Sequence, residues 1–136
     1  MRYLIDKSAL ARRAKPAVRG VLDPLIQRGL LAVTGVVEME ILYSARNPAE
    51  AEKLRYWLAG FDYLPCPDEC WDRAKEVQAQ ATRTGNHRAL SMADLLIAAT
   101  AERHGVPVLH YDEDYEQIAK LTGQAHEWVA PAGTAD

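Results

Sequence analysis

Three aspartates lie where a folded chain would bring carboxylates together. Asp6 directly follows the short apolar run "YLI", and Asp112 directly follows the run "PVLHY". Asp94 lies in "SMADLLIAATA", where every residue from Leu95 to Ala101 is apolar or Thr. A carboxylate on the first turn of such a buried helix is costly to desolvate unless it is paired or bound to a metal. The pattern therefore indicates chemistry that uses clustered carboxylates.

The segment "VVEMEILYSA" repeats this pattern, because Glu38 and Glu40 interrupt an otherwise apolar helix. We expect at least one of the two to be buried, and the helical periodicity leaves open which. No lysine or arginine lies in this helix before Arg46. Crowded carboxylates raise one another's pKa unless a cation lies among them. Oxygen-only ligand sets favour hard cations, so Mg²⁺ or Mn²⁺ is expected rather than zinc or copper.

Each acid taken alone also has a structural explanation. Ser91 could cap a helix whose capping box Asp94 completes. Asp112 could cap the next helix, with Asp114 as a first-turn acid near the helix dipole. It is the combination of acids at these positions that favours a metal site.

The acids would be positioned by short strands that alternate with longer helices. Strands are expected at residues 3–5, 30–34, 62–66, 107–111 and 126–130, and helices at 8–13, 16–28, 35–47, 48–61, 67–85, 91–104 and 112–122. Strands separated by helices pair in parallel through right-handed crossovers, so we expect the α/β class, as a three-layer α/β/α sandwich with a mainly parallel central sheet. In such sheets ligands bind outside the carboxyl ends of the strands, where Asp6 and Asp112 lie.

Length and composition fit one globular domain spanning residues 1–136. Hydrophobic residues make up 49% and charged residues 26% of the chain, which argues against disorder. No apolar run approaches the ~18 residues of a membrane helix. The first apolar run ends at Asp6, without the core of a signal peptide, so we expect a cytoplasmic protein without a membrane association. Cys66 and Cys70 lack a second Cys/His pair and are expected to be free thiols rather than zinc ligands.

Four motifs cover nearly the whole chain in the order and spacing of a known family. They are "YLIDKSAL", "EILYSAR", "ADLLIAATAERHG" and "VLHYDEDYEQIA". With them the chain resembles the PIN-domain family, and in particular the VapC toxins of bacterial toxin–antitoxin pairs. The resemblance favours Glu40 over Glu38, and it implies that Ser8 helps to hold water at the metal. Lys7 stands where such proteins commonly have Thr, which leaves its role open. The catalytic, metal-binding acids that the resemblance implies are Asp6, Glu40, Asp94 and Asp112, with Asp114 near the site as a further metal residue.

The resemblance implies an Mg²⁺- or Mn²⁺-dependent endoribonuclease that cuts tRNA or rRNA. Water activated at the cation would attack phosphorus in line. The implied partners are a VapB-type antitoxin and a second copy of the chain in a homodimer. The net charge of −3 becomes +2 once the five acids of the site are set aside. The basic side chains that could then bind phosphate, unless they are ordinary solvated groups, are Arg12, Arg13, Lys15, Arg19, Arg83, His87 and Arg88.

Two other classes of protein share parts of this pattern. A receiver-type phosphoacceptor domain needs an acid at the end of its third strand, where this chain has "YLPCP". It also needs a lysine after a late strand. A non-catalytic PIN-like interaction module would keep the fold, but the intact acids argue against it. A metal-binding titration would separate such a module from an enzyme.

Overall fold

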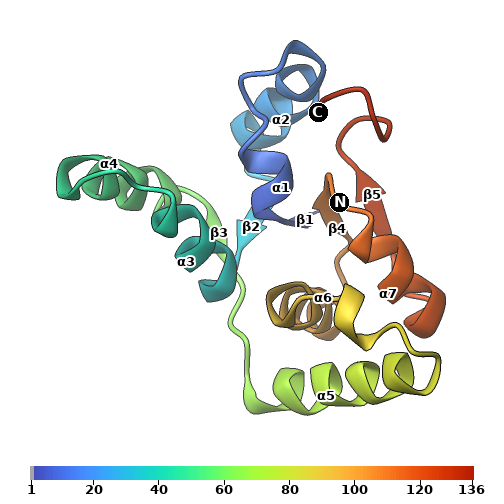
Figure 1. Cartoon of the computed structure of the whole chain (residues 1–136). Coiled ribbons are helices and arrows are strands. Elements are labelled where there is room, and N and C mark those ends of the chain that lie inside the picture. The colour runs from blue at the N-terminus through green and yellow to red at the C-terminus, as the bar shows by residue number, and fades with distance from the viewer. Residues whose placement is uncertain (1) are drawn as a thin grey trace.

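The computed structural model describes residues 2–136, which form strands that alternate with helices (Figure 1). In chain order the elements are β1 (Tyr3–Ile5), α1 (Lys7–Leu10), α2 (Pro16–Gln27), β2 (Leu31–Val33), α3 (Gly35–Tyr43), α4 (Pro48–Leu58), β3 (Asp62–Tyr63), α5 (Asp68–Arg83), the short 3₁₀ helix η1 (His87–Ala89), α6 (Met92–His104), β4 (Val108–His110), α7 (Asp114–Thr122) and β5 (His126–Trp128).

The strands form a parallel sheet in the order β3-β2-β1-β4-β5. At its centre β1 pairs with β4, and Ile5 lies opposite Leu109. This register brings the carboxyl ends of β1 and β4 to one edge of the sheet. Asp6 and the segment that follows β4 therefore start from neighbouring positions, as the sequence predicts.

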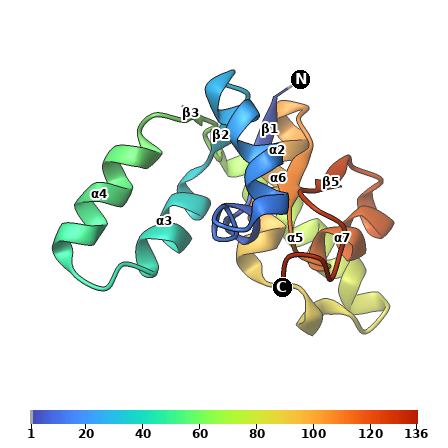
Figure 2. The ribbon, with the colours of Figure 1, turned by 90° about the horizontal axis from the view of Figure 1, so that it is seen from above.

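Helices cover the sheet from both sides, so the expected three-layer α/β/α arrangement is confirmed. Figure 1 shows α1 and α2 on one side of the strands and α5, α6 and α7 on the other. The pair α3 and α4 extends away from the sheet, which Figure 2 shows from above. The central strands supply fully buried residues such as Leu4 and Ile5, and α2 contributes the buried residues Val18 and Leu22 to the same hydrophobic core.

The structure differs from the predicted elements mainly at their ends. Strand β3 keeps only two residues of the expected 62–66, because Pro65 has no backbone N–H for a ladder. Helix α7 begins at Asp114, two residues later than expected, and η1 was not predicted. In α4, Leu58 alone is fully buried, and Leu54 and Trp57 pack against the core from its margin.

Among residues 2–136, no helix combines the length and the hydropathy needed to cross a bilayer.

Candidate metal centre

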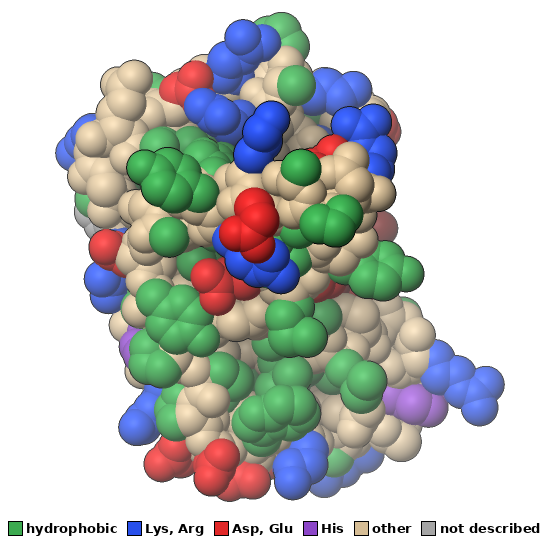
Figure 3. Space-filling model, turned by 90° about the vertical axis from the view of Figure 1, so that its left-hand side faces the viewer, with side chains coloured by type: hydrophobic (Ala, Val, Ile, Leu, Met, Phe, Trp, Pro, Cys, Tyr) green, Lys and Arg blue, Asp and Glu red, His purple; other side chains and the backbone are tan. Residues whose placement is uncertain are grey.

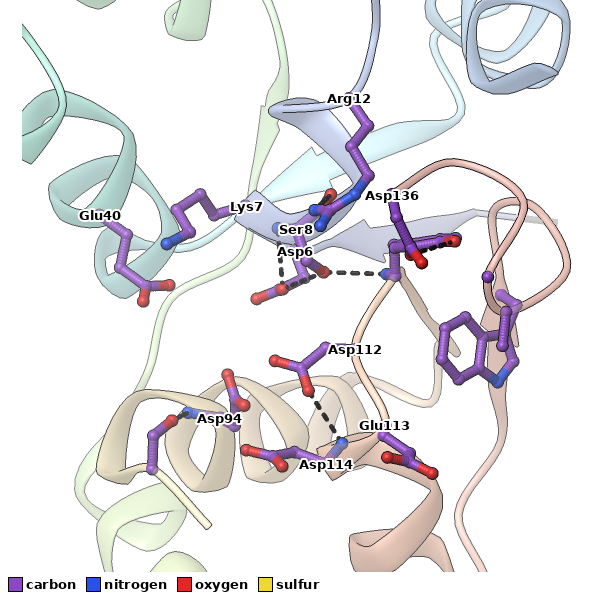
Figure 4. Close-up of a pocket in the computed structure, with 15 residues that line it drawn as sticks. Asp6, Lys7, Ser8, Arg12, Glu40, Asp94, Asp112, Glu113, Asp114 and Asp136 are labelled. Atoms are coloured by element: carbon purple, nitrogen blue, oxygen red, sulfur yellow. Dashed lines mark hydrogen bonds between the residues drawn. The ribbon is translucent and has the colours of Figure 1, made fainter. Parts of the chain in front are cut away.

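Three aspartates from separate elements converge at the carboxyl edge of the sheet. Asp6, Asp94 and Asp112 each offer an oxygen, and these oxygens all lie within 4.8 Å of one another. Figure 4 shows the three side chains pointing into one cleft from the β1–α1 junction, the first turn of α6 and the loop after β4. Asp6 is 2% exposed and Asp94 is 6% exposed. The structure thus brings together three of the predicted site residues.

Asp6 is fixed by hydrogen bonds to both of its carboxylate oxygens. Oδ2 accepts from the backbone N–H of Ser8 at 3.0 Å and from Ser8 Oγ at 2.5 Å. Oδ1 accepts from the hydroxyl of Tyr115 at 2.8 Å. Ser8 Oγ in turn accepts from the backbone N–H of Tyr111 at 2.9 Å, which sets the direction of its own proton towards Asp6. In this structure Ser8 therefore orients the Asp6 carboxylate.

Asp94 lies in the first turn of α6, where burial and neighbouring carboxylates disfavour its charged form. Its backbone N–H donates to Ser91 Oγ at 3.0 Å, which is the helix cap that the sequence predicts. Burial, followed by repulsion from Asp6, raises the pKa of Asp94 to about 9. A carboxyl group with such a pKa is ionised at neutral pH only when a positive charge is added near it.

Asp112 is held by hydrogen bonds at both its side chain and its backbone. Its Oδ1 accepts from the backbone N–H of Asp114, the first residue of α7, at 2.9 Å, although the N-cap position itself belongs to Glu113. The backbone N–H of Asp112 donates to Nδ1 of the buried His110 at 3.1 Å. That nitrogen therefore carries no proton, and His110 donates from Nε2 to Nδ1 of His126 at 2.8 Å. Burial, followed by His126, lowers the pKa of His110 to about 3 and keeps the ring neutral.

Glu40 faces these aspartates from α3, across the cleft (Figure 4). The expectation that Glu38 or Glu40 would be buried was wrong, because both are partly exposed where α3 leaves the body of the protein. However, Oε1 of Glu40 is itself buried and has no hydrogen-bond partner among residues 2–136. Burial, followed by repulsion from Asp6, raises the pKa of Glu40, and Lys7 opposes this shift. Glu38 does not line the cleft.

The donor set fits a hard divalent cation. It contains only carboxylate oxygens, which Mg²⁺ and Mn²⁺ prefer. Within residues 2–136, no lysine or arginine forms an ion pair with Asp6, Asp94 or Asp112. The unpartnered oxygen of Glu40 and the raised pKa of Asp94 are both features that a bound cation would relieve.

The acids line a cleft of about 700 Å³ that is open to solvent. Of the basic side chains predicted to bind phosphate, Arg12 lines this cleft. Its guanidinium already donates to the backbone oxygens of Ser8, at 2.8 Å, and Ala135, at 3.1 Å. Arg13 pairs with Asp23 at 3.1 Å, away from the acids. Lys7 also lines the cleft, where its side chain extends towards Glu40 (Figure 4), and it becomes the most direct candidate for a phosphate contact.

The sequence did not predict the buried residues that support the acids through hydrogen bonds. Tyr115 is 2% exposed and bonds to two of the aspartates. In the sequence it is indistinguishable from a core residue of an amphipathic helix. The bond between His110 and His126 spans two strands and has no signal in the spacing. These contacts depend on the pairing of β4 with its neighbours.

Comparison with known proteins agrees with this fold and site. The sequence pattern of the PIN domain family matches residues 2–121. "Ribonuclease VapC21" of Mycobacterium tuberculosis is 48% identical over 135 residues, covering 98% of each chain. "Ribonuclease VapC51" of the same species is 40% identical over 136 residues, covering 100% of this chain and 98% of the relative.

Solved structures show the same fold at lower sequence identity. VapBC-1 from nontypeable Haemophilus influenzae superposes with a TM-score of 0.77 at 13% identity, over 95% of this chain and 98% of that chain. The DNA-bound VapBC from Salmonella typhimurium gives a TM-score of 0.74 at 16% identity, over 96% of this chain and 99% of that chain.

A parallel sheet with clustered carboxylates at its carboxyl edge defines a class of α/β proteins built around an acidic centre. Within that class the chain belongs to the PIN-domain family, among the proteins named as VapC ribonucleases.

Proposed function

We propose that this chain is an Mg²⁺- or Mn²⁺-dependent endoribonuclease, a VapC-type toxin that hydrolyses RNA phosphodiester bonds and is neutralised by a VapB-type antitoxin. The observation that carries the proposal is the convergence of Asp6, Asp94 and Asp112 within 4.8 Å. The relatives named as ribonucleases support the reaction, and the neighbours solved as VapBC support the partner.

The chain's own residues prepare this site for a cation. Asp6, Asp94 and Asp112 would be ligands, with Glu40 facing them and Asp114 beside them, and Ser8 keeps Asp6 in place. When bound, the cation supplies an activated water and neutralises charge that builds on the phosphodiester oxygens. The catalytic and metal-binding roles of Asp6, Glu40, Asp94 and Asp112, and the ligand role of Asp114, stay predictions.

The surroundings of the site suit a nucleic-acid backbone. The cleft is open, so a polymer can pass through it without entering the core. Lys7 is exposed next to the acids and could contact a phosphate on one side of the scissile bond. We propose tRNA or rRNA as the RNA class, and hence the cytoplasm as the site of action.

We propose that the antitoxin binds in an apolar groove beside the cleft. It has a volume of about 620 Å³ and runs between α3, α5 and α6. Its exposed hydrophobic residues are Met39, Tyr43, Trp71 and Met92, and Figure 3 shows hydrophobic side chains gathered on this face. Lys7 and Glu40 line both the groove and the cleft, so a segment bound in the groove would also reach the acids.

We further propose that the chain forms a homodimer, as the resemblance to VapC toxins implies. Light scattering on the purified protein, with and without its antitoxin, would give the mass of each assembly. A monomer at every concentration would contradict the proposal.

Cleavage of RNA by the purified protein tests the function. The expected result is endonucleolytic cleavage with Mg²⁺ or Mn²⁺ that stops in EDTA. Asp94→Asn should be inactive while still folded, because asparagine keeps the shape but not the charge. Asp68→Asn, in the exposed first turn of α5, is the matched control and should cleave normally. Cleavage that persists in EDTA or in Asp94→Asn would contradict the proposal, and metal binding without cleavage would favour a non-catalytic module.

A further inference from the structure

The most completely buried polar contact at the acidic centre comes from Tyr115, in the first turn of α7. Its hydroxyl donates to Asp6 Oδ1 at 2.8 Å and lies 3.2 Å from Asp94 Oδ1. Tyr115 is separated from these residues by 109 and 21 positions in the sequence. The Tyr115 hydroxyl on α7 therefore contacts the β1–α1 junction through Asp6 and the first turn of α6 through Asp94.

The ring of Tyr115 is held independently of the acids. It packs against His110 with ring centroids 4.8 Å apart, and Tyr115 is among the largest fully buried side chains. A hydroxyl on a ring fixed in this way cannot follow the carboxylates if they turn. In the structure both Asp6 and Asp94 have an Oδ1 within hydrogen-bond distance of this hydroxyl.

The hydrogen bonds to Asp6 limit the acceptor sites that its carboxylate can offer to a cation. A carboxylate offers about four acceptor sites, two on each oxygen. Oδ2 of Asp6 accepts two hydrogen bonds, both from Ser8. Oδ1 accepts one, from Tyr115. The remaining acceptor site of Asp6 is therefore on Oδ1, so the tyrosine and any cation must share that oxygen.

We propose that Tyr115 is a positioning residue of the metal centre, whose hydroxyl holds Asp6 and Asp94 so that one divalent cation can bind both. It acts through the two carboxylates and does not touch the RNA, since it is only 2% exposed. The inference rests on the proposed function, because it assigns a role towards the cation of that site. Residues that orient metal ligands in this way typically change metal affinity about 10- to 100-fold when they are altered.

The test is the substitution Tyr115→Phe, which keeps the ring and its packing and removes the hydroxyl alone. We expect Mn²⁺ binding, measured by isothermal titration calorimetry on the whole chain, to weaken about tenfold. In RNA cleavage the Mn²⁺ concentration for half-maximal rate should rise by the same factor, while kcat at saturating Mn²⁺ returns towards the wild-type value. Tyr56→Phe, on the exposed face of α4, is the matched control and should leave both quantities unchanged.

Two further readouts separate positioning from a purely structural role. Thermal melts in EDTA report on the fold, and a structural role would lower the melting temperature of Tyr115→Phe without changing its affinity for Mn²⁺. In the wild-type protein, Mn²⁺ should perturb the near-ultraviolet absorption of a buried tyrosine, and this signal should be absent from Tyr115→Phe but present in Tyr56→Phe.

The outcomes distinguish this inference from the proposed function. Equal Mn²⁺ affinity in wild type and Tyr115→Phe would overturn the positioning role and leave the ribonuclease intact. A wild-type protein that binds no Mn²⁺ would overturn both.

Discussion

Replacing Asp94 by asparagine should stabilise the metal-free protein at pH 7, although Asp94 is a buried polar residue. Burial, followed by repulsion from Asp6, raises its pKa from 3.8 to about 9. When the pKa of a group is higher in the folded than in the unfolded state, its contribution to stability is complete at pH values below the pKa of the unfolded state. Its contribution is lost as the pH rises from 3.8 towards about 9.

The magnitude follows from the proton that Asp94 must take up on folding. One pKa unit corresponds to about 1.4 kcal/mol, so at pH 7 the cost is at most about 4 kcal/mol. Asparagine needs no proton on folding, but its buried amide has few hydrogen-bond partners, which reduces the gain in stability by about 2 kcal/mol. The expected net gain in the free energy of unfolding is about 2 kcal/mol, or roughly 6 °C in melting temperature for a chain of this length.

The assay is urea unfolding in EDTA between pH 7 and pH 9. Over this range the wild type should lose stability as the pH rises, and Asp94→Asn should lack that loss. Asp68→Asn, which is exposed at the start of α5, should keep the wild-type slope. An Asp94→Asn protein that is less stable than wild type throughout, with the same slope, would refute the electrostatic reasoning.

Three other perturbations test separate parts of the structure. Mn²⁺ at 100 times its dissociation constant stabilises a fold by about 2.7 kcal/mol, so it should raise the wild-type melting temperature and barely change that of Asp6→Asn; equal shifts would argue against a ligand role for Asp6. Because the pKa of His110 is lowered to about 3, its stabilising effect is fully present above pH 6.5 and is lost as the pH falls towards 3. In EDTA, the melting temperature of His110→Gln should therefore fall less steeply than that of the wild type as the pH is lowered. The same dependence on pH in both proteins would show that His110 is not the cause of the acid destabilisation. Trp71→Ala, in the apolar groove, should weaken antitoxin binding by about 2 kcal/mol in a calorimetric titration while RNA cleavage continues; unchanged affinity would place the antitoxin elsewhere.

The sequence predicts the sheet and three of its acids because both depend on local patterns. Short apolar runs between amphipathic helices imply parallel pairing, and parallel strands share a carboxyl edge. Asp6 and Asp112 follow two such runs, and the apolar stretch after Asp94 marks a buried helix. These observations are sufficient to predict that the three carboxylates meet, and the structure confirms it.

Other parts of the site depend on contacts that no spacing encodes. Glu38 and Glu40 are equivalent by periodicity, and the direction in which α3 leaves the sheet decides that Glu40 faces the cleft. Arg12 looks like a free phosphate contact in the sequence, but it bonds to the backbone of Ala135, 123 residues away. Tyr115 reaches Asp6 only because β1 and β4 are neighbours in the sheet.

The most direct test of the central claim is a crystal structure of the protein grown with Mn²⁺, using the anomalous scattering of manganese to locate the ion. The account predicts an anomalous peak within coordination distance of carboxylate oxygens of Asp6, Asp94 and Asp112. The absence of a peak at these residues, with manganese bound elsewhere on the chain, would contradict it.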